Sequence, residues 1–135
     1  MASGSCACHY IRYTTSVPPT SLINCHCKTC RKQAGAPYQS WVHFPPDNIQ
    51  WSVEPTVWKS SDDAYRTFCP QCGSTLTMKK YPNEVSLAAG TLDDSPEWKA
   101  QVSPPTKHIY LEEKASWFEL PEDGAARWDR GSDRS

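Results

Sequence analysis

The sequence has 135 residues, 38% of them hydrophobic, and a formal net charge of −1 at pH 7. This length allows one domain with a modest core but not two ordinary domains. Because no basic stripe is present, we expect neither a nucleic-acid nor a membrane partner. The first ten residues lack the apolar segment of a signal peptide, and the apolar runs are far shorter than a membrane span, so we expect a cytoplasmic protein.

Short segments with alternating, aromatic or branched residues predict a mainly β protein. The stretch YQSWVHF at 38–44 shows this alternation most clearly. In chain order, further strands are expected over residues 49–53, 56–60, 75–80, 84–92, 107–112 and 115–120. Twelve prolines break the chain too often for long helices, so helical turns are expected only over 28–34 and 95–102. The loss of apolar periodicity after Leu120 predicts a domain over 1–120 and a loose tail over 121–135.

The seven cysteines fall into three clusters, which are Cys6 with Cys8, Cys25 with Cys27 and Cys30, and Cys69 with Cys72. An odd number of cysteines in a reducing compartment argues against a disulfide framework. C-x-C and C-x-x-C spacings instead let two thiolates from one turn reach the same ion, as tetrahedral zinc requires. Buried structural thiols would be scattered, and neither C-x-x-C is expected to open a helix after a strand in the βαβ setting of redox proteins. The pattern therefore favours zinc.

Seven thiolates match one zinc site with four ligands and a second site with three. A structural site uses four protein ligands, whereas a catalytic site keeps three and leaves one position for water or substrate. Cys25, Cys27 and Cys30 can bind one ion locally, and the two outer pairs would then share the other. A shared ion would tie the N-terminal segment to the far half of the chain and close a large loop. A partition that joins Cys6 and Cys8 to Cys25 and Cys27 satisfies the same spacing.

Five segments occur in order along the chain, and they are GSCAC at 4–8, CHCKTCRKQAGAP at 25–37, FCPQCGSTL at 68–76, GTLDD at 90–94 and PPTKHIYLEEKASWF at 104–118. This series spans residues 4–118 and resembles the glutathione-dependent formaldehyde-activating enzyme family, which also includes centromere protein V. The resemblance implies that residues 1–120 form a zinc-knuckle β-tent fold of antiparallel sheets with little helix. One position departs from the family, because His9 stands where glycine commonly follows the first C-x-C.

The resemblance also implies two zinc ions per chain, one structural and one catalytic. The structural ion would be bound by Cys6, Cys8, Cys69 and Cys72, and the catalytic ion by Cys25, Cys27 and Cys30. Zn²⁺ with three thiolates carries a formal charge of −1, so it is a weak Lewis acid whose softness favours a thiol as the fourth ligand. Coordination would deprotonate that thiol and hold the thiolate beside a carbonyl compound.

The reaction implied by the family is the addition of glutathione to formaldehyde, which gives S-hydroxymethylglutathione and is a carbon–sulfur lyase reaction in reverse. We therefore expect a zinc-dependent carbon–sulfur lyase or synthase that acts through a zinc-bound thiolate on a small molecule such as glutathione, with no oligomeric state assigned. One alternative is a thiol carrier that does not accelerate the chemistry, and another is a non-catalytic zinc module with a protein partner. The chain lacks the long basic or proline-rich arm that such a module would use, which favours the enzyme.

Polar residues in these segments are candidates for proton transfer and substrate contacts. His108 and Asp93 are the candidate catalytic residues, since either could donate a proton to the alkoxide formed on the aldehyde. The alternatives are that His108 is a buried histidine with its hydrogen bonds satisfied and that Asp93 accepts hydrogen bonds in a turn. Arg31 and Lys32 directly follow the cysteine triplet and could pair with the carboxylates of glutathione. His26 lies between two cysteines, and on an extended knuckle its ring would point away from the metal, so we expect a structural role.

Overall fold

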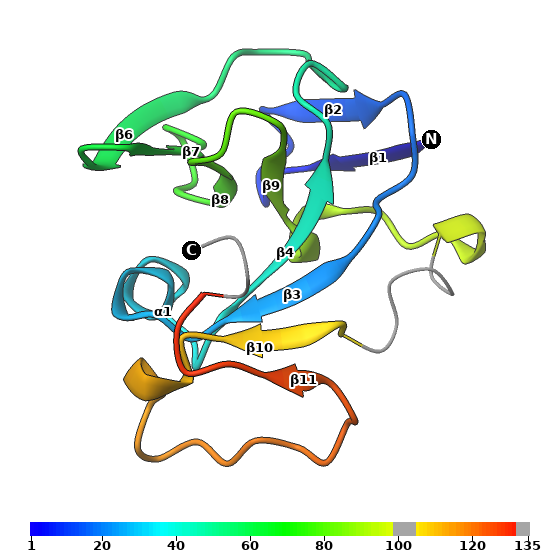
Figure 1. Ribbon diagram of the computed structural model, residues 1–135. Helices are drawn as coiled ribbons and strands as arrows, with labels where there is room; N and C mark the ends of the chain where they lie inside the picture. The colour runs from blue at the N-terminus through cyan, green and yellow to red at the C-terminus, as the bar shows by residue number, and fades with distance from the viewer. Residues whose placement is uncertain (99–104, 132–135) are drawn as a thin grey trace.

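The structure is a computed structural model that describes residues 1–98 and 105–131, and within them the protein is mainly β. A small antiparallel sheet contains, in order, β1 (Ala2–Ser5), β2 (Arg12–Thr15) and β5 (Ile49–Trp51). The longer sheet contains, in order, β11 (Ala126–Arg127), β10 (Lys107–Ile109), β3 (Leu22–Cys25), β4 (Gln39–Phe44), β9 (Val85–Ala88), β8 (Thr75–Lys79), β7 (Ala64–Phe68) and β6 (Thr56–Ser61). Figure 1 shows β6 and β11 at opposite ends of this sheet. The expected mainly β fold is confirmed.

The longer sheet is antiparallel from β3 to β6, but β10 pairs in parallel with both β3 and β11. Parallel neighbours require a long connection. Residues 26–106 separate β3 from β10, and residues 110–125 separate β10 from β11. In this arrangement His108 of β10 lies opposite Asn24, and Ile109 lies opposite Cys25. Strand β10 therefore lies beside Cys25, which belongs to the cluster of Cys25, Cys27 and Cys30.

Most of the expected strands are present with small shifts at their ends. The strands expected over 38–44, 49–53, 56–60 and 75–80 are β4, β5, β6 and β8. The strands expected over 84–92 and 107–112 end early, because the 3-10 helices η1 (Ala89–Thr91) and η2 (Leu111–Glu113) follow β9 and β10. Strands β1, β2, β3, β7 and β11 are not among the sequence predictions, since they are short and carry many small or polar residues.

The strand expected over 115–120 is wrong, because this segment is a turn followed by a loop. The Phe118 N–H donates a hydrogen bond to the Ala115 carbonyl at 3.1 Å, and Trp117 is 69% exposed. The Phe118 ring lies with its centroid 5.6 Å from that of Tyr38 and 6.1 Å from that of His26. The aromatic residues of segment 115–120 thus suggest a strand, but Phe118 packs against the rings of Tyr38 and His26 and does not join a sheet.

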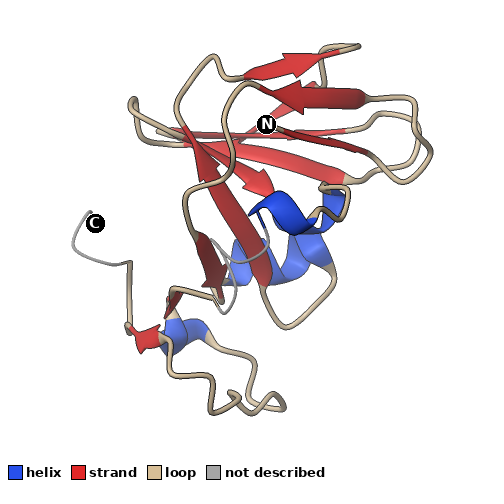
Figure 2. Ribbon diagram, turned by 90° about the vertical axis from the view of Figure 1, so that its right-hand side faces the viewer, coloured by secondary structure: helices blue, strands red, loops and turns tan. Residues whose placement is uncertain are grey.

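Helix is scarce, as expected, and the helical turn predicted over 28–34 is α1 (Lys28–Ala34). The Sγ atom of Cys27 caps its first turn by accepting a hydrogen bond from the Cys30 N–H, and Gly35 ends it with a left-handed φ of 64°. In the second predicted helical segment, residues 96–98 are helical, and residues 99–102 lie outside the described residues. Figure 2 shows how short the helices are beside the strands. No described helix has the length and apolar character needed to cross a membrane.

The largest apolar cluster lies between the two sheets. Tyr13 from the small sheet packs there with Val42, Phe44 and Leu87 from the longer sheet. Full burial of a side chain such as Phe44 or Leu87 contributes about 1.5–3 kcal/mol. This cluster fixes the two sheets against each other, and two smaller clusters form around cysteines on either side of it.

Residues 121–131 pack against the domain, which differs from the loose tail expected over 121–135. Strand β11 pairs with β10, and the Trp128 N–H donates to the His108 carbonyl at 3.0 Å. The contact continues beyond the strands, where the Tyr110 N–H donates to the Arg130 carbonyl at 2.9 Å. Residues 132–135 lie outside the described residues, and the proposed domain boundary at residue 120 stays a prediction.

Candidate metal centres

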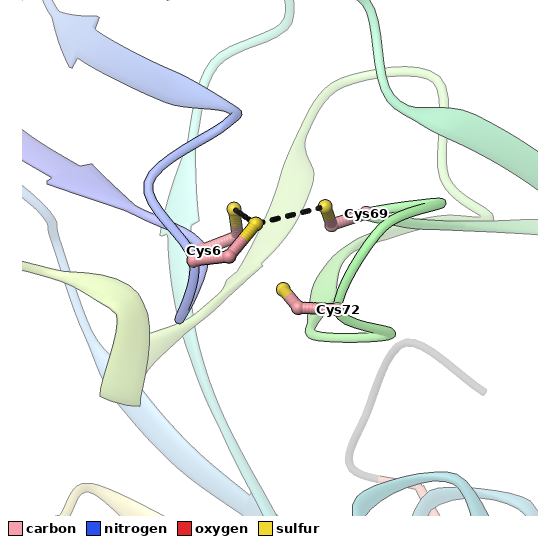
Figure 3. A group of neighbouring side chains, drawn as sticks. Cys6, Cys69 and Cys72 are labelled. Carbon is pink, nitrogen blue, oxygen red and sulfur yellow. Dashed lines mark hydrogen bonds between the residues drawn. The ribbon is translucent and has the colours of Figure 1, made fainter.

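Four cysteines from two distant turns come together, and we call Cys6, Cys8, Cys69 and Cys72 the four-cysteine group. One turn links β1 to β2 and the other links β7 to β8. Their Sγ atoms all lie within 4.8 Å of one another, and Figure 3 shows the sulfurs of Cys6, Cys69 and Cys72 facing a common space. The Cys8 sulfur lies 3.7 Å from that of Cys6 and 3.9 Å from that of Cys69. Four sulfurs about 2.3 Å from one zinc would be about 3.8 Å apart, so the group fits a tetrahedral ion.

Each turn of the four-cysteine group contains one residue with a left-handed backbone. His9 follows Cys8 with a φ of 65°, and Gly73 follows Cys72 with a φ of 77°. Their N–H groups donate to the carbonyls of Cys6 and Cys69 respectively, which closes each turn. The left-handed φ gives a physical reason for glycine at the position of His9, because only glycine adopts this conformation without strain.

The sulfurs of the four-cysteine group accept hydrogen bonds from uncharged groups. The Ile11 N–H donates to Cys6 Sγ at 3.3 Å, and the Gln71 N–H donates to Cys69 Sγ at 3.4 Å. The Ser74 hydroxyl lies 3.2 Å from Cys72 Sγ, and its hydrogen bond lowers the pKa of that thiol to about 5. Hydrogen bonds thus favour the thiolate form of Cys72.

The remaining cysteines, Cys25, Cys27 and Cys30, form the three-cysteine group. Cys25 ends β3, Cys27 caps α1 and Cys30 lies in the first turn of that helix. Their sulfurs also lie within 4.8 Å of one another, and no fourth cysteine, histidine or carboxylate of the described residues joins them. Three soft donors at this separation fit zinc with one position left for another ligand. The sequence left the partition of the cysteines open, and the structure groups them as the family resemblance implied.

The structure agrees with the expectation that neither C-x-x-C lies in the βαβ setting of redox proteins. Cys27 and Cys30 do open a helix directly after a strand, because α1 follows β3. The flanking strands β3 and β4 are antiparallel neighbours, so this is not the parallel βαβ unit of redox proteins. Cys25 adds a third thiol beside Cys27 and Cys30, which further supports a metal site and not a redox dithiol.

A cavity of about 270 Å³ opens beside the three-cysteine group. All three cysteines line it, together with the apolar side chains of Trp41, Met78 and Ile109, the phenols of Tyr81 and Tyr110, and the cations of Arg66 and Lys80. This volume is close to the lower end of the range for small-molecule sites, about 300 Å³. The three-cysteine group is therefore buried at the wall of a small-molecule cavity, whereas Cys8 and Cys72 of the other group are exposed.

Arg66, Lys80 and Tyr110 line this cavity and were missed by the sequence analysis, and Arg66 is the one that contacts a cysteine. It lies on β7 and is only 6% exposed, and its Nη1 donates to Cys30 Sγ at 3.4 Å and to Gln33 Oε1 at 3.0 Å. Its guanidinium carbon lies 5.9 Å from the ring centroid of Trp41. The sequence around it, AYRTF, alternates in burial as a strand does, which puts Arg66 on the same face as Ala64. That alternation is the signal that could have indicated an inward-pointing arginine.

The thiols of the three-cysteine group do not titrate alike. Hydrogen bonds from Cys25 and Cys27 hold the pKa of Cys30 far below its ordinary value, and the charge of Arg66 lowers it further. The pKa of Cys25 is raised, because Cys27 and Cys30 compete with it for the negative charge. The first thiolate of this group is thus favoured at Cys30, beside the guanidinium.

A chain of buried polar contacts lies behind the three-cysteine group. His26 Nε2 lies 3.0 Å from His108 Nδ1, and His108 Nε2 lies 2.8 Å from Asp123 Oδ2. With the carboxylate of Asp123 as acceptor, His108 donates from Nε2 and His26 donates from its own Nε2. The hydrogen bond from His108 lowers the pKa of Asp123, and burial lowers the pKa of His26 to about 4, so His26 is neutral at pH 7.

This chain bears on two residues singled out from the sequence. The His26 ring packs 5.0 Å from that of Tyr38, and its backbone N–H donates to the Ile109 carbonyl, as its expected structural role requires. His108 is 1% exposed and is not among the described residues that line the cavity. Its role as a proton donor stays a prediction. Asp123, which lies in the expected loose tail, was not singled out because its partner is distant in sequence.

The other candidates lie away from the cavity among the described residues. The Asp93 carboxylate accepts a hydrogen bond from the Ser3 hydroxyl at 2.9 Å, and the backbone N–H of Asp93 donates to the Ser3 carbonyl. Arg31 donates from Nη1 to the Glu113 carbonyl at 2.8 Å, and Lys32 is exposed on α1. The cations that do line the cavity are Arg66 and Lys80. The roles given to Asp93, Arg31 and Lys32 also stay predictions.

Comparisons with known proteins agree with the geometry. A family profile described as glutathione-dependent formaldehyde-activating enzyme matches residues 1–113. An uncharacterized lyase from Schizosaccharomyces pombe is 30% identical over 73 residues, which are 54% of this chain and 53% of that protein. The chain therefore matches about half the length of this curated relative. The crystal structure of a Rhodobacter sphaeroides protein has the same fold, with a TM-score of 0.60 over 93% of this chain and 98% of that one at 13% identity.

Proposed function

Because this chain belongs to the glutathione-dependent formaldehyde-activating enzyme family, we propose that it is a carbon–sulfur lyase that joins a small thiol to formaldehyde or another small aldehyde. The observation that carries this proposal is the group of three sulfurs, without a fourth protein ligand among the described residues, at the wall of a 270 Å³ cavity. The lyase named in Schizosaccharomyces pombe supports the same reaction type. We expect the activity in a reducing compartment such as the cytoplasm, because all seven cysteines are free thiols.

Two zinc ions per chain complete the proposal. An ion in the four-cysteine group would stabilise the fold by tying two distant turns together. An ion in the three-cysteine group would supply a Lewis-acidic position for the sulfur of the substrate and lower the pKa of that thiol. The donor sets support this division, since four sulfurs close one centre and three leave a position on the other.

The residues of the cavity bind and orient the two reactants. Trp41, Met78 and Ile109 give it apolar walls that exclude water from the reacting sulfur. Tyr110 lines the same cavity, and burial raises its pKa, so its hydroxyl stays protonated and can donate a hydrogen bond to the aldehyde oxygen. Lys80 lines the cavity as well and can pair with a carboxylate of a thiol such as glutathione.

The proposed reaction needs no oxidant or reductant. A bond forms between the thiol sulfur and the aldehyde carbon while the π bond of the carbonyl breaks. The thiol loses one proton and the oxygen gains one, so a hydroxymethyl thioether results from formaldehyde. The protein's contribution is to hold the two reactants together in one orientation and to stabilise the charge that develops on oxygen.

The test is the exchange rate between free ¹³C-formaldehyde and its glutathione adduct, measured by NMR with zinc-loaded protein. We expect exchange above the protein-free background, and a return to background in Cys30→Ser, which removes one sulfur from the three-cysteine group alone. S-methylglutathione, which has no free thiol, should show no exchange. Background exchange with glutathione bound would support a thiol carrier instead. Background exchange without binding would overturn both glutathione roles and leave a non-catalytic module.

A further inference from the structure

Arg66 is a buried cation that forms no salt bridge with a carboxylate among the described residues. Its guanidinium contacts Cys30 Sγ, the amide oxygen of Gln33 and the face of Trp41. Burial of an unpaired charge is strongly unfavourable, so a buried arginine normally has an anionic partner. The nearest anion that this site can provide is a thiolate of the three-cysteine group.

Among the residues that the structure describes, no cation donates a hydrogen bond to the four-cysteine group. Its sulfurs receive backbone N–H groups and the Ser74 hydroxyl. Cys8 and Cys72 are exposed, so water can solvate the negative charge of a four-thiolate zinc centre. In the three-cysteine group Cys25 and Cys30 are buried, and solvation by water is replaced by one fixed positive charge.

We propose that Arg66 is a positioning residue that balances the charge of the three-cysteine centre and makes its open position select an anionic ligand. Zn²⁺ with three thiolates has a formal charge of −1, and a fourth thiolate brings it to −2. Without a nearby cation, a second negative charge would be repelled at a buried site, and a neutral ligand would be favoured. With the guanidinium beside Cys30, the centre and Arg66 together have a formal charge of zero before the substrate thiolate binds and −1 afterwards. This inference rests on the proposed function only where it identifies the anionic ligand of the open position as the substrate thiolate.

The position of Arg66 depends on two elements that meet at the cavity. It is anchored on β7, and Gln33 of α1 accepts a hydrogen bond from the same Nη1 that contacts Cys30 Sγ. The two N–H groups of Nη1 thus join β7 to α1 through Cys30 and Gln33. Lysine would keep the charge but lose the planar fork, so it would replace Arg66 only in part.

The test compares an anionic and a neutral probe on cobalt-substituted protein, with azide and imidazole as ligands and visible absorbance as the signal. Arg66→Met and Arg66→Gln both remove the charge, and Gln keeps an N–H group near Cys30. We expect both variants to bind azide and glutathione about 10- to 100-fold more weakly than the wild type, the range for a hydrogen bond to a charged group. Imidazole should bind with unchanged or higher affinity. Arg66→Lys should lie between, and Arg127→Met, which removes an exposed arginine on β11, should match the wild type.

Several outcomes separate the possibilities. Equal weakening of azide and imidazole would indicate general damage to the centre and would overturn the selection of anions. Unchanged azide affinity in both neutral variants would overturn it as well. If Arg66→Met does not fold, Arg66→Gln gives the same comparison, and failure of both to fold with metal would show a structural role and contradict the proposal. If glutathione does not bind the wild type while azide binding depends on Arg66, the proposed function fails and this inference stands.

Discussion

The four-cysteine group and the three-cysteine group both hold their sulfurs close together, but they are built from different parts of the chain. The first joins the β1–β2 turn to the β7–β8 turn, which are more than sixty residues apart in numbering, as Cys6 and Cys69 show. The second comes from six consecutive residues at the junction of β3 and α1. Loss of the first would release two distant segments, whereas loss of the second would leave every strand connected. From this difference we propose that the first group serves the fold and the second serves chemistry.

Burial and charge separate the two groups further. Backbone N–H groups donate to the sulfurs of Cys6 and Cys69 in the four-cysteine group, and Cys8 and Cys72 are exposed. The three-cysteine group lines a cavity, and Arg66 donates a hydrogen bond to the sulfur of Cys30. On our proposal, the three-cysteine group with Arg66 beside it would bind a further anion, whereas the four-cysteine group would be complete with four sulfurs.

Removal of one ligand from each group should give the largest contrast. Cys69→Ser removes a fully buried sulfur of the four-cysteine group, and we expect the variant not to fold, since structural zinc contributes on the order of 10–16 kcal/mol of apparent binding free energy. Cys27→Ser should fold and contain about one zinc less per chain. Circular dichroism and elemental analysis of the wild type and both variants provide the measurement. A folded Cys69→Ser with one zinc, or an unfolded Cys27→Ser, would contradict the division of roles.

A smaller effect is expected from the buried contacts behind the three-cysteine group. His108→Phe keeps an aromatic ring but removes the hydrogen-bond partner of both His26 and Asp123. We expect a loss of about 1–3 kcal/mol in the free energy of unfolding, because a buried polar atom of His26 is left unpaired. Chelator titration should show faster zinc loss from the three-cysteine group and no change at the other. Asp123→Asn, which keeps an oxygen acceptor, should lose less stability, and an equal loss would argue against the hydrogen-bond chain.

The smallest effect should come from the backbone of the four-cysteine group. His9→Gly relieves a left-handed φ of 65° and should raise the free energy of unfolding by about 0.5–1 kcal/mol. Gly73→Ala is the matched control, because a methyl group there meets open space and only the φ of 77° opposes it. It should lower stability by about 1 kcal/mol. Thermal unfolding of the zinc-loaded proteins measures both, and changes of the same sign would contradict this account of the turns.

Local patterns in the sequence predict what short-range chemistry decides. The alternation of 38–44 indicates β4, and the cysteine spacing indicates the metal ligands, because neighbours in the chain determine both. Strand β3 is not predicted because Ile23, Asn24 and Cys25 are buried in succession and show no alternation. The Asn24 side chain accepts a hydrogen bond from the Ser40 hydroxyl of β4. Partners across the sheet, and not the sequence of β3 itself, make this segment a strand.

The contacts that complete the site are those that the sequence could not indicate. Arg66 reaches Cys30 from β7, and Asp123 reaches His108 from a segment without apolar periodicity. Both contacts depend on how distant strands lie in the longer sheet. The sequence shows which residues are able to bind zinc, but the register of the sheet decides which charges surround them.

The most direct test of the division between a closed and an open centre is the number of sulfur ligands per zinc, measured by X-ray absorption on the two-zinc protein. Without added thiol, the average should lie between three and four, because one centre has four sulfurs and the other has three. Addition of glutathione should raise the average to four, and S-methylglutathione should leave it unchanged. An average of four before any thiol is added, or no increase with glutathione, would contradict an open centre that accepts sulfur.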